Sequence, residues 1–324
     1  MNTDIKLKDL KREYDRNFKP DKAYLDSMPD LQNGEFVGIP IDYVGIAGMK
    51  FPLTIKQKGG GSQEVLATVI GSVDLDSQSR GINMSRILRT WGIDNPNEIK
   101  QLSIDDLIEV VNEYRKKLGS LSAHISVEFE YRIWLPSLRS TNDSGELNGG
   151  WQYYPVVFDV DINKYGNVNA VMEVTYTYSS HCPCSTELAQ HAAFTRGVAG
   201  SPHAQRSFAK AEIRFGDMVW IEDVIGALRN GVASEVQVFV KREDEQSFGE
   251  LCAAEGTVFV EDAIRRFSDS LDKVPGVLDY KVSCCHCESL HAHSAIACRT
   301  KGIPNSPFKP TFTLAEWRDL EFHK

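Results

Sequence analysis

The sequence predicts an α+β fold built on antiparallel sheets. Segments with alternating apolar and polar residues, typical of half-buried strands, occur in both halves of the chain. In each half these segments flank segments with helical spacing, and the two kinds do not follow one another in the βαβ order of a parallel sheet. With 324 residues, of which 42% are hydrophobic, the chain is long enough for one extended domain or two packed modules.

The first half is predicted to contain four strands and two helices after a charged N-terminal arm. The strands are expected at Gly38 to Leu53, Glu64 to Leu75, Ser122 to Leu135 and Trp151 to Ile162. The first strand is expected to be short and to end in a turn. A short helix is expected at Ile87 to Thr90, and a longer helix is expected to begin after the N-cap Ser103 and to stop at Gly119.

The second half is predicted to repeat this arrangement approximately. Strands are expected at Val168 to Tyr178, Gln205 to Phe215, Glu235 to Val240, Gly276 to Ser283 and Ala292 to Cys298. A helix or loop is expected from Glu187 to about Gly200. Two further helices are expected at Met218 to Leu228 and Val258 to Leu271, because their apolar residues recur at helical spacing.

Composition limits the class of protein. The formal net charge of -9 argues against a protein that mainly binds nucleic acid, which usually carries a basic surface. No apolar run has the length of a membrane span, and the N-terminus lacks the apolar segment of a signal peptide, so we expect a cytoplasmic protein without a membrane partner. Seven cysteines, three of them within Cys284 to Cys287, indicate metal binding or catalysis rather than a disulfide framework.

The segment Ser-His-Cys182-Pro-Cys184-Ser places two thiols and an imidazole around a rigid proline. Such a corner can hold Zn²⁺ or activate a nucleophile. A second cluster far along the chain, Cys284 to His293, has complementary ligand types, which suggests a shared metal site. Cys284, Cys285 and Cys287 are alternatively a separate zinc knuckle or small buried residues of a strand.

Other side chains able to bind a metal or move a proton are His203, Glu245, Glu261, Glu288, His291 and His293. Residues two apart in an extended segment share a face, so the two cysteines of the corner can point together, as can His291 and His293. A thiolate, imidazoles and a carboxylate suit Zn²⁺ or a neighbouring first-row metal, and this mixture favours hydrolysis over a structural zinc. Taken singly, Glu245 and Glu261 are also typical of a solvated acidic surface, and His203 is typical of a loop.

Six motifs between Val37 and Arg299 occur in an order that resembles the type IB GTP cyclohydrolases, the FolE2 family. They are Gly-Ile-Asn-Met-Ser-Arg86, Ser-His-Cys-Pro-Cys-Ser185, His203-Ala-Gln-Arg-Ser207, Lys-Arg-Glu-Asp-Glu245, Phe-Val-Glu-Asp262 and Glu288-Ser-Leu-His291-Ala-His293. The resemblance implies a tunnelling fold (T-fold), with two tandem modules of antiparallel sheet and helices on one face. It implies an arm at 1–35, modules at 36–163 and 164–310, and a tail at 311–324. It also implies a homotetramer with active sites at subunit interfaces.

The resemblance also implies a role for each candidate residue. The implied metal ligands are Cys182, His203 and Glu245, with His291 as a further ligand or a proton carrier. The implied catalytic groups are the thiol of Cys184 and the acid-base groups Glu288 and His293. The implied substrate contacts are Glu261 on the guanine edge, and Arg86 and Arg206 on the triphosphate. The implied metal is Zn²⁺ or Mn²⁺, with Fe²⁺ as a further candidate.

The implied reaction is hydrolysis of GTP to 7,8-dihydroneopterin triphosphate and formate, an early step towards folate or related pterins. Three alternatives remain at this point. An archaeal-type Fe²⁺-dependent relative forms a cyclic phosphate, a nitrile reductase on the same fold uses a cysteine and a glutamate, and a zinc-stabilised binding protein has no activity. The chain departs from the family pattern at His181, at Cys284 to Cys287, and by an insertion of about nine residues within His191 to Pro202.

Overall fold

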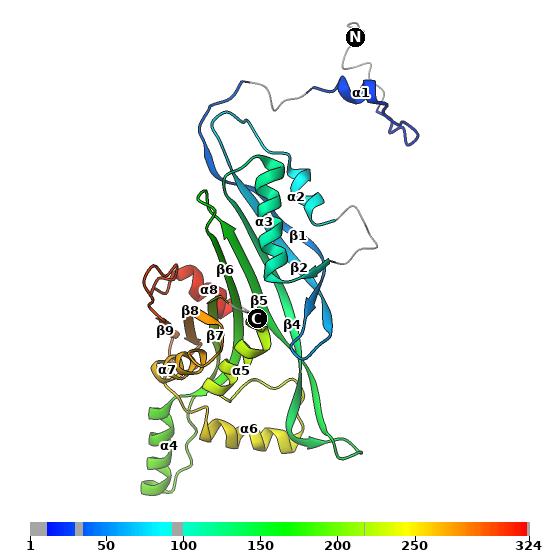
Figure 1. Ribbon diagram of the computed structural model, residues 1–324. Helices are drawn as coiled ribbons and strands as arrows, with labels where there is room; N and C mark the ends of the chain where they lie inside the picture. Colours follow the sequence, from blue (N-terminus) through cyan, green and yellow to red (C-terminus); the bar gives the residue numbers. More distant parts are fainter. Residues whose placement is uncertain (1–11, 30–34, 93–99, 217, 323–324) are drawn as a thin grey trace.

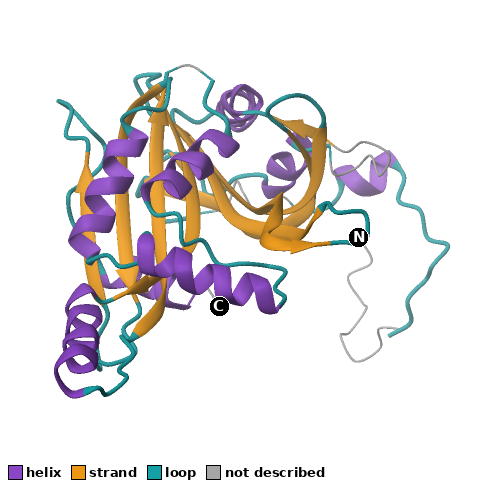
Figure 2. Cartoon of the chain, turned by 90° about the horizontal axis from the view of Figure 1, so that it is seen from below, coloured by secondary structure: helices purple, strands orange, loops and turns teal. Residues whose placement is uncertain are grey.

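The computed structural model describes residues 12–29, 35–92, 100–216 and 218–322, and its nine strands form one curved sheet (Figures 1 and 2). The strand order is β3-β1-β2-β4-β5-β6-β7-β8-β9. The strands of the first half are β1 (Ile41–Lys56), β2 (Ser62–Leu75), β3 (Lys100–Leu102), β4 (Ala123–Thr141) and β5 (Leu147–Ile162). Those of the second half are β6 (Val168–His181), β7 (Ala204–Phe215), β8 (Val277–His286) and β9 (Ala295–Thr300).

The sheet is antiparallel except at one edge. The short strand β3 pairs in parallel with β1, while the other seven neighbouring pairs are antiparallel. Strands β5 and β6 pair from Val156 with Val174 to Ile162 with Val168, so the two halves of the chain share one continuous sheet. Both predicted modules therefore belong to a single sheet, and their boundary at residue 163 stays a prediction.

The main core lies on one face of this sheet. On β2 the alternating residues Val65, Ala67, Val69 and Val73 are all buried, as their spacing predicts. Three helices cover this face, namely α3 (Ile104–Leu118), α5 (Ile221–Gly231) and α7 (Val260–Leu271). Their buried residues belong to the same hydrophobic cluster as the strands, which confirms the predicted arrangement for these helices.

Helix α3 illustrates how local sequence sets the ends of an element. The Ser103 side chain and the Asp106 carboxylate each bond the other residue's backbone N–H, which is a complete capping box. The helix ends at Gly119, whose φ of 70° lies in the left-handed region that glycine adopts readily. Both ends agree with the prediction from the sequence.

Helix α8 (Leu314–Phe322) differs from the others because it packs on the opposite face of the sheet. Its buried Leu320 contacts Phe208 of β7 and Cys285 of β8, which form a cluster separate from the main core. On β7 the alternate residues Ala209 and Ala211, which face the other side of the sheet from Phe208, belong instead to the main core. The segment predicted as a tail therefore contains a packed helix. The expectation that helices cover only one face of the sheet is wrong, because α8 packs on the other face.

Several predicted boundaries differ from the structure. Strand β1 is long rather than short, and a bulge between Ile46 and Met49 lets it continue past its glycines. The strand predicted from Glu235 to Val240 is wrong, since Glu235 makes only an isolated bridge with Tyr178 and no strand follows in this described segment. The sequence analysis also missed α6 (Arg242–Ala254).

The remaining helices are short or lie outside the core. Helix α1 (Lys22–Asp26) lies in the predicted arm and is fully exposed, and α2 (Met84–Thr90) contains the short predicted helix. Helix α4 (Pro183–Arg196) projects from the body, and none of its described residues is buried. In the part of the chain that the structure describes, no helix has the length and apolar composition needed to cross a membrane.

Candidate active site

The Cys-Pro-Cys corner lies where strand β6 ends and helix α4 begins. Cys182 is the N-cap residue, and Pro183 occupies the first helical position, where its missing N–H costs nothing. This turn separates the two thiols. Cys182 is half-buried and lines a cavity of about 240 Å³, whereas Cys184 is exposed and does not line it.

The 240 Å³ cavity brings together five of the predicted site residues from distant parts of the chain. These residues are Cys182, Glu261, Glu288, His291 and His293. Glu261 lies in the first turn of α7, and the other three come from the loop that joins β8 to β9. We call this loop, residues 287–294, the histidine loop. The cavity therefore joins the cysteine corner to the second cluster, as the sequence analysis predicted.

His203 lies beside this cavity, just before β7, and contacts the histidine loop. Its Nδ1 atom is 3.2 Å from Oε2 of Glu288 and 3.3 Å from Oε1 of Gln205. Gln205 in turn donates from Nε2 to Oε1 of Glu288 at 3.3 Å and to the hydroxyl of Ser180 at 2.9 Å. Gln205 was not among the predicted site residues, although it lies two positions after His203, a spacing that places side chains on one side of an extended segment.

The histidines of this region lie close to one another. The rings of His291 and His293 stack with centroids 5.1 Å apart, and the ring of His203 meets that of His291 edge-on at 6.0 Å. His181, at the end of β6, is affected as well, because partial burial and the charge of His203 lower the pKa of its imidazole. Imidazoles gathered in this way can accept and donate protons or bind a cation in their neutral form.

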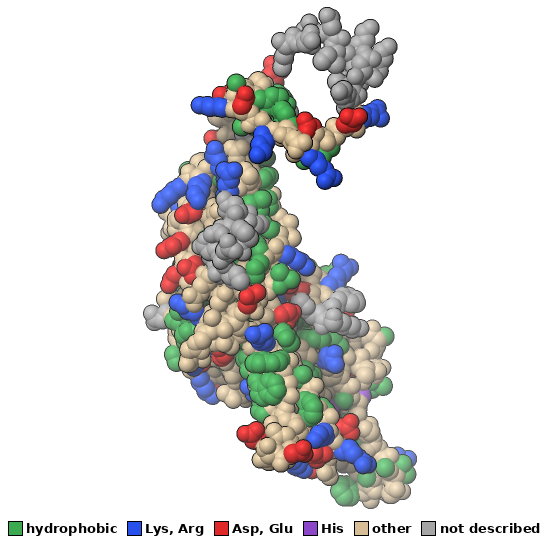
Figure 3. Space-filling view, turned by 90° about the vertical axis from the view of Figure 1, so that its right-hand side faces the viewer, with side chains coloured by type: hydrophobic (Ala, Val, Ile, Leu, Met, Phe, Trp, Pro, Cys, Tyr) green, Lys and Arg blue, Asp and Glu red, His purple; other side chains and the backbone are tan. Residues whose placement is uncertain are grey.

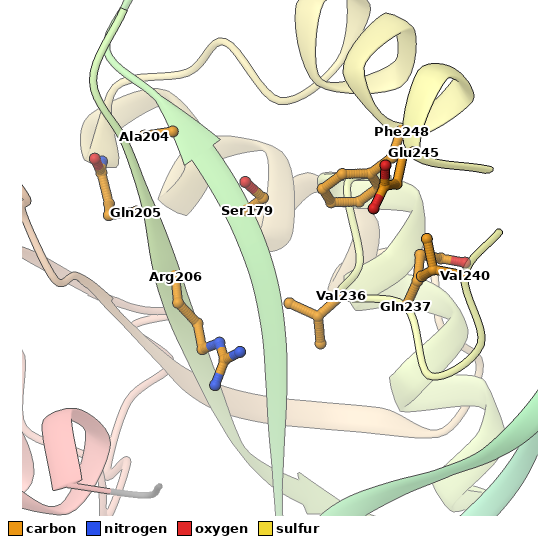
Figure 4. Close-up of a pocket in the computed structure, with 9 residues that line it drawn as sticks. All are labelled: Ser179, Ala204, Gln205, Arg206, Val236, Gln237, Val240, Glu245 and Phe248. Atoms are coloured by element: carbon orange, nitrogen blue, oxygen red, sulfur yellow. The ribbon is translucent and has the colours of Figure 1, made fainter. Parts of the chain in front are cut away.

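Glu245 and Arg206 line a different cavity from that of Cys182. This second cavity, of about 460 Å³, lies between β7, helix α6 and the segment after Glu235 (Figure 4). Gln205 lines both cavities, so they are neighbours. Within one chain the structure thus does not bring Glu245 together with Cys182.

Arg86 lies far from both cavities in the first half of the chain. It is a residue of α2, and its Nη1 donates to the backbone carbonyl of Lys117 at 2.8 Å. That contact satisfies a carbonyl near the C-terminus of α3. Within one chain the Arg86 side chain therefore binds the C-terminal end of α3 and does not approach the candidate site.

The cysteines of the second cluster are mostly buried residues of a strand. Cys284 and Cys285 are fully buried in β8 on opposite faces of the sheet, and burial raises the pKa of the Cys284 thiol well above its usual range. The Sγ atoms of Cys285 and Cys287 are 4.0 Å apart. The structure therefore agrees with the burial hypothesis for Cys284 and Cys285. All seven cysteines lie in the described part of the chain and are free.

The donor set around the 240 Å³ cavity suits a divalent first-row cation. One thiol, several imidazoles and carboxylates are the ligands that Zn²⁺ and Mn²⁺ use in proteins. The Oε2 atom of Glu288 is buried, and its 3.2 Å approach to Nδ1 of His203 lacks hydrogen-bond geometry, so it has no hydrogen-bond partner among the described residues. This indicates room for a charged group nearby. As the described side chains stand, no three of the ligand type converge closely enough to coordinate an ion. The side chains around this cavity are thus of the types that bind such a metal, and they line the same cavity.

Comparisons with known proteins agree on one family. Residues 28–297 match the family model described as "Type I GTP cyclohydrolase folE2". A "GTP cyclohydrolase FolE2" of Paracoccus denitrificans (strain Pd 1222) is 41% identical over 299 residues, which cover 90% of each chain. A protein of the same name from Jannaschia sp. (strain CCS1) is 39% identical over 300 residues, covering 91% of this chain and 80% of the relative.

A solved structure supports the fold independently of sequence. The uricase from Arthrobacter globiformis superposes with a TM-score of 0.50 at 8% identity, covering 83% of this chain and 96% of the uricase. At that identity the similarity concerns the fold alone. Urate oxidase is a T-fold protein, so the predicted tunnelling fold is confirmed.

Proposed function

The chain belongs to the type I GTP cyclohydrolase FolE2 family, and from this membership we propose how its site carries out the reaction. The activity is the hydrolysis of GTP to 7,8-dihydroneopterin triphosphate with release of formate, the first step towards folate and related pterins. The family assignment decides against a nitrile reductase and against a binding protein without activity. It also makes the enzyme metal-dependent.

We propose Zn²⁺ or Mn²⁺ as the metal, held by Cys182, His203 and Glu245 with His291 as a further ligand. Cys182 and His291 line the same cavity, and His203 lies beside it, next to Glu288. When bound, the cation supplies Lewis acidity that activates water for attack at C8 of the purine. Glu245 lines the adjoining cavity and would reach this site only through movement of α6 or from a second subunit.

The chain's own groups orient the substrate and move protons. Glu261 lines the cavity from the first turn of α7, where its carboxylate can accept hydrogen bonds from the guanine N–H edge. His293 and the exposed thiol of Cys184 are the proposed proton carriers for ring opening and closure. Glu288 and Gln205 both face Nδ1 of His203, which leaves Nε2 as the nitrogen available for the cation.

We propose that the enzyme is a homotetramer with active sites between subunits, in the cytoplasm. Arg86 and Glu245 lie outside the cavity of their own chain, and subunit contacts would give such groups access to a neighbouring site. Hydrophobic side chains also gather on one face of the chain (Figure 3). Large exposed side chains on β4 and β5 include Trp134, Trp151 and Tyr153. Exposed apolar surface of this kind is typical of subunit contacts.

The observation that carries the proposal is the single cavity lined by Cys182, Glu261, Glu288, His291 and His293. The test is formate release from GTP by the purified chain with Zn²⁺, Mn²⁺ or Fe²⁺ added singly, with the product identified by mass spectrometry. We expect formate equal to the GTP consumed and a product that retains a linear triphosphate. A cyclic phosphate would identify the archaeal-type reaction, and no formate with any of the metals would contradict the proposal.

A further inference from the structure

Helix α8 lies directly behind the histidine loop, on the side away from the main core. Its Leu320 is 0% exposed and packs against Phe208 and Cys285, and Trp317 and Phe312 pack around the same cluster. This contact removes apolar side chains of α8 from water, which stabilises the packing of the helix on the sheet. The C-terminal segment is thus held firmly against β7 and β8.

The same segment contacts both ends of the histidine loop. At the start of the loop, Cys287 packs against the cluster around Leu320. At its end, the hydroxyl of Ser294 donates to Oε2 of Glu321 at 3.4 Å. A further cavity of about 450 Å³ is lined jointly by the loop and by the C-terminal segment, with His293 on one side and Trp317 on the other. The loop contains no helix or strand of its own in this fully described segment.

Two buried lysines fix the position of α8 along the strands. Lys281 of β8 is 5% exposed and pairs with Glu316, and Lys210 of β7 is 9% exposed and lies 3.2 Å from Asp319. A buried ammonium group is costly unless it is paired. Each lysine also lies near a strand carboxylate, Glu173 at 3.4 Å from Lys210 and Glu212 at 3.6 Å from Lys281. The two carboxylates of α8, three residues apart on one side of the helix, add a second partner to each lysine and so align the helix on the sheet.

We propose that α8 is a positioning element for the histidine loop, and that its contacts set the places of Glu288, His291 and His293 in the active site. The inference rests on the proposed function for the roles of these residues. A loop without regular structure takes its position from contacts at its ends. Here one side of the loop meets His203 and Gln205, and the other side meets α8. The residues that match the family model end at 297, so α8 lies beyond them.

The test uses the full chain with Trp317→Ala and Leu320→Ala combined, which removes the apolar contact of α8 with the sheet. We expect backbone hydrogen exchange in residues 287–294 to rise at least about tenfold, because local stability comes from those contacts. Exchange in α5 should stay unchanged. We also expect kcat for formate release to fall about tenfold or more, with a smaller change in the KM for GTP, since displaced catalytic groups slow the reaction itself.

The matched control is Arg318→Ala, because Arg318 lies on the same helix and is exposed. This variant should behave as wild type in both measurements. Leu320→Met alone should retain most of the wild-type activity and loop protection, since the two side chains have similar volume. If the double variant does not fold, Glu316→Gln, which weakens the pair with Lys281, provides a milder test with the same expected direction.

Faster exchange of α8 with unchanged exchange of the loop would overturn the positioning role. A loop that exchanges faster while kcat stays at the wild-type value would overturn it as well. Hydrogen exchange needs no substrate, so it tests the contact even where the reaction fails. A wild-type chain that releases no formate contradicts the proposed function, whereas an active wild type with an equally active double variant contradicts only this inference.

Discussion

Glu288 and His203 approach each other closely, with 3.2 Å between Oε2 of the carboxylate and Nδ1 of the imidazole, and both side chains are nearly buried at 11% and 13% exposure. The two residues are 85 positions apart in the sequence and come from different strand ends. A carboxylate at this distance favours a proton on Nδ1, which leaves Nε2 with a free lone pair. Glu288 acts here together with Gln205, whose Oε1 also faces Nδ1 at 3.3 Å, so that Nε2 of His203 is the nitrogen left for a cation.

Replacing Glu288 by Gln should weaken metal binding without unfolding the protein. Loss of such an orienting carboxylate typically costs about 10- to 100-fold in metal affinity or activity. The affinity can be measured by competition with a chromophoric chelator, and the activity by formate release. The exposed Glu187 of α4 provides the control, because Glu187→Gln removes a charge near the site without a contact to His203. Wild-type affinity and kcat in the Glu288 variant would contradict this role.

The two cysteines of the corner should have separable roles. Cys182 lines the cavity and Cys184 does not, so Cys182→Ser should lose most bound metal, whereas Cys184→Ser should retain it. Loss of a proton carrier lowers kcat by about 10²- to 10⁴-fold, which we expect for Cys184→Ser. Metal content by elemental analysis and formate release distinguish the two variants. Cys298→Ser, on β9, is the control, and equal metal loss in both corner variants would refute the assignment.

Alternation of apolar residues was sufficient to predict most strands and the face that they bury. The burial of Val65, Ala67 and Val69 follows directly from period-two spacing against a hydrophobic core. The segment Glu235 to Val240 shows the same kind of alternation but does not pair as a strand. Glu235 is instead fixed by Arg229 at 2.7 Å and by Tyr154, contacts from distant elements that no local pattern reports.

Chemical identity predicted the members of the site better than their arrangement. Residue type and motif order were enough to bring Cys182, Glu261, Glu288, His291 and His293 into one hypothesis, and the fold places all five around one cavity. The separate cavity of Glu245 depends on α6, which the sequence analysis missed despite acidic residues in its first turn. The contact of α8 with the loop is also tertiary, and no periodicity in the sequence indicates it.

Asp244 fixes helix α6, and with it Glu245, to the long hairpin of β4 and β5. Its carboxylate accepts hydrogen bonds from the backbone N–H groups of Lys241 at 2.9 Å and of Arg139 and Ser140, both at 2.8 Å. Burial alone would raise the pKa of Asp244, but the hydrogen bonds from Ser140, Lys241 and Arg139 outweigh it and leave the pKa below its usual value. The folded protein therefore stabilises the ionised carboxylate.

Substituting Asp244 by Ala should lower the free energy of unfolding by about 2 kcal/mol or more, because it removes a helix cap and leaves three backbone donors unpaired. Urea denaturation followed by circular dichroism measures the change. Glu243→Ala alters the neighbouring exposed residue in the same turn and should have little effect. Equal stability of the two variants would show that α6 is held by other contacts.

His286, the last residue of β8, should make the stability of the protein depend on pH. Burial lowers the pKa of its imidazole from 6.5 to about 4, and the hydroxyl of Tyr178 lies 2.9 Å from Nε2. The folded protein thus keeps His286 neutral, with Tyr178 donating to Nε2, while the unfolded chain takes up a proton below pH 6.5. The contribution of His286 to the free energy of unfolding is complete above pH 6.5. It is lost as the pH falls from 6.5 towards 4, because in this window the unfolded state binds more protons than the folded state.

At about 1.4 kcal/mol per pKa unit, His286 should cost the wild type about 2 to 3 kcal/mol of unfolding free energy between pH 7 and pH 4.5. In His286→Gln this loss should be absent, because an amide accepts the Tyr178 hydrogen bond but does not titrate. Buried carboxylates such as Glu173 and Glu212, whose pKa values burial raises, contribute equally to both proteins. The difference between the two denaturation curves at each pH therefore isolates His286. If the free energy of unfolding fell equally with pH in the wild type and in His286→Gln, the imidazole would be protonated in the folded protein, with Tyr178 no longer its donor.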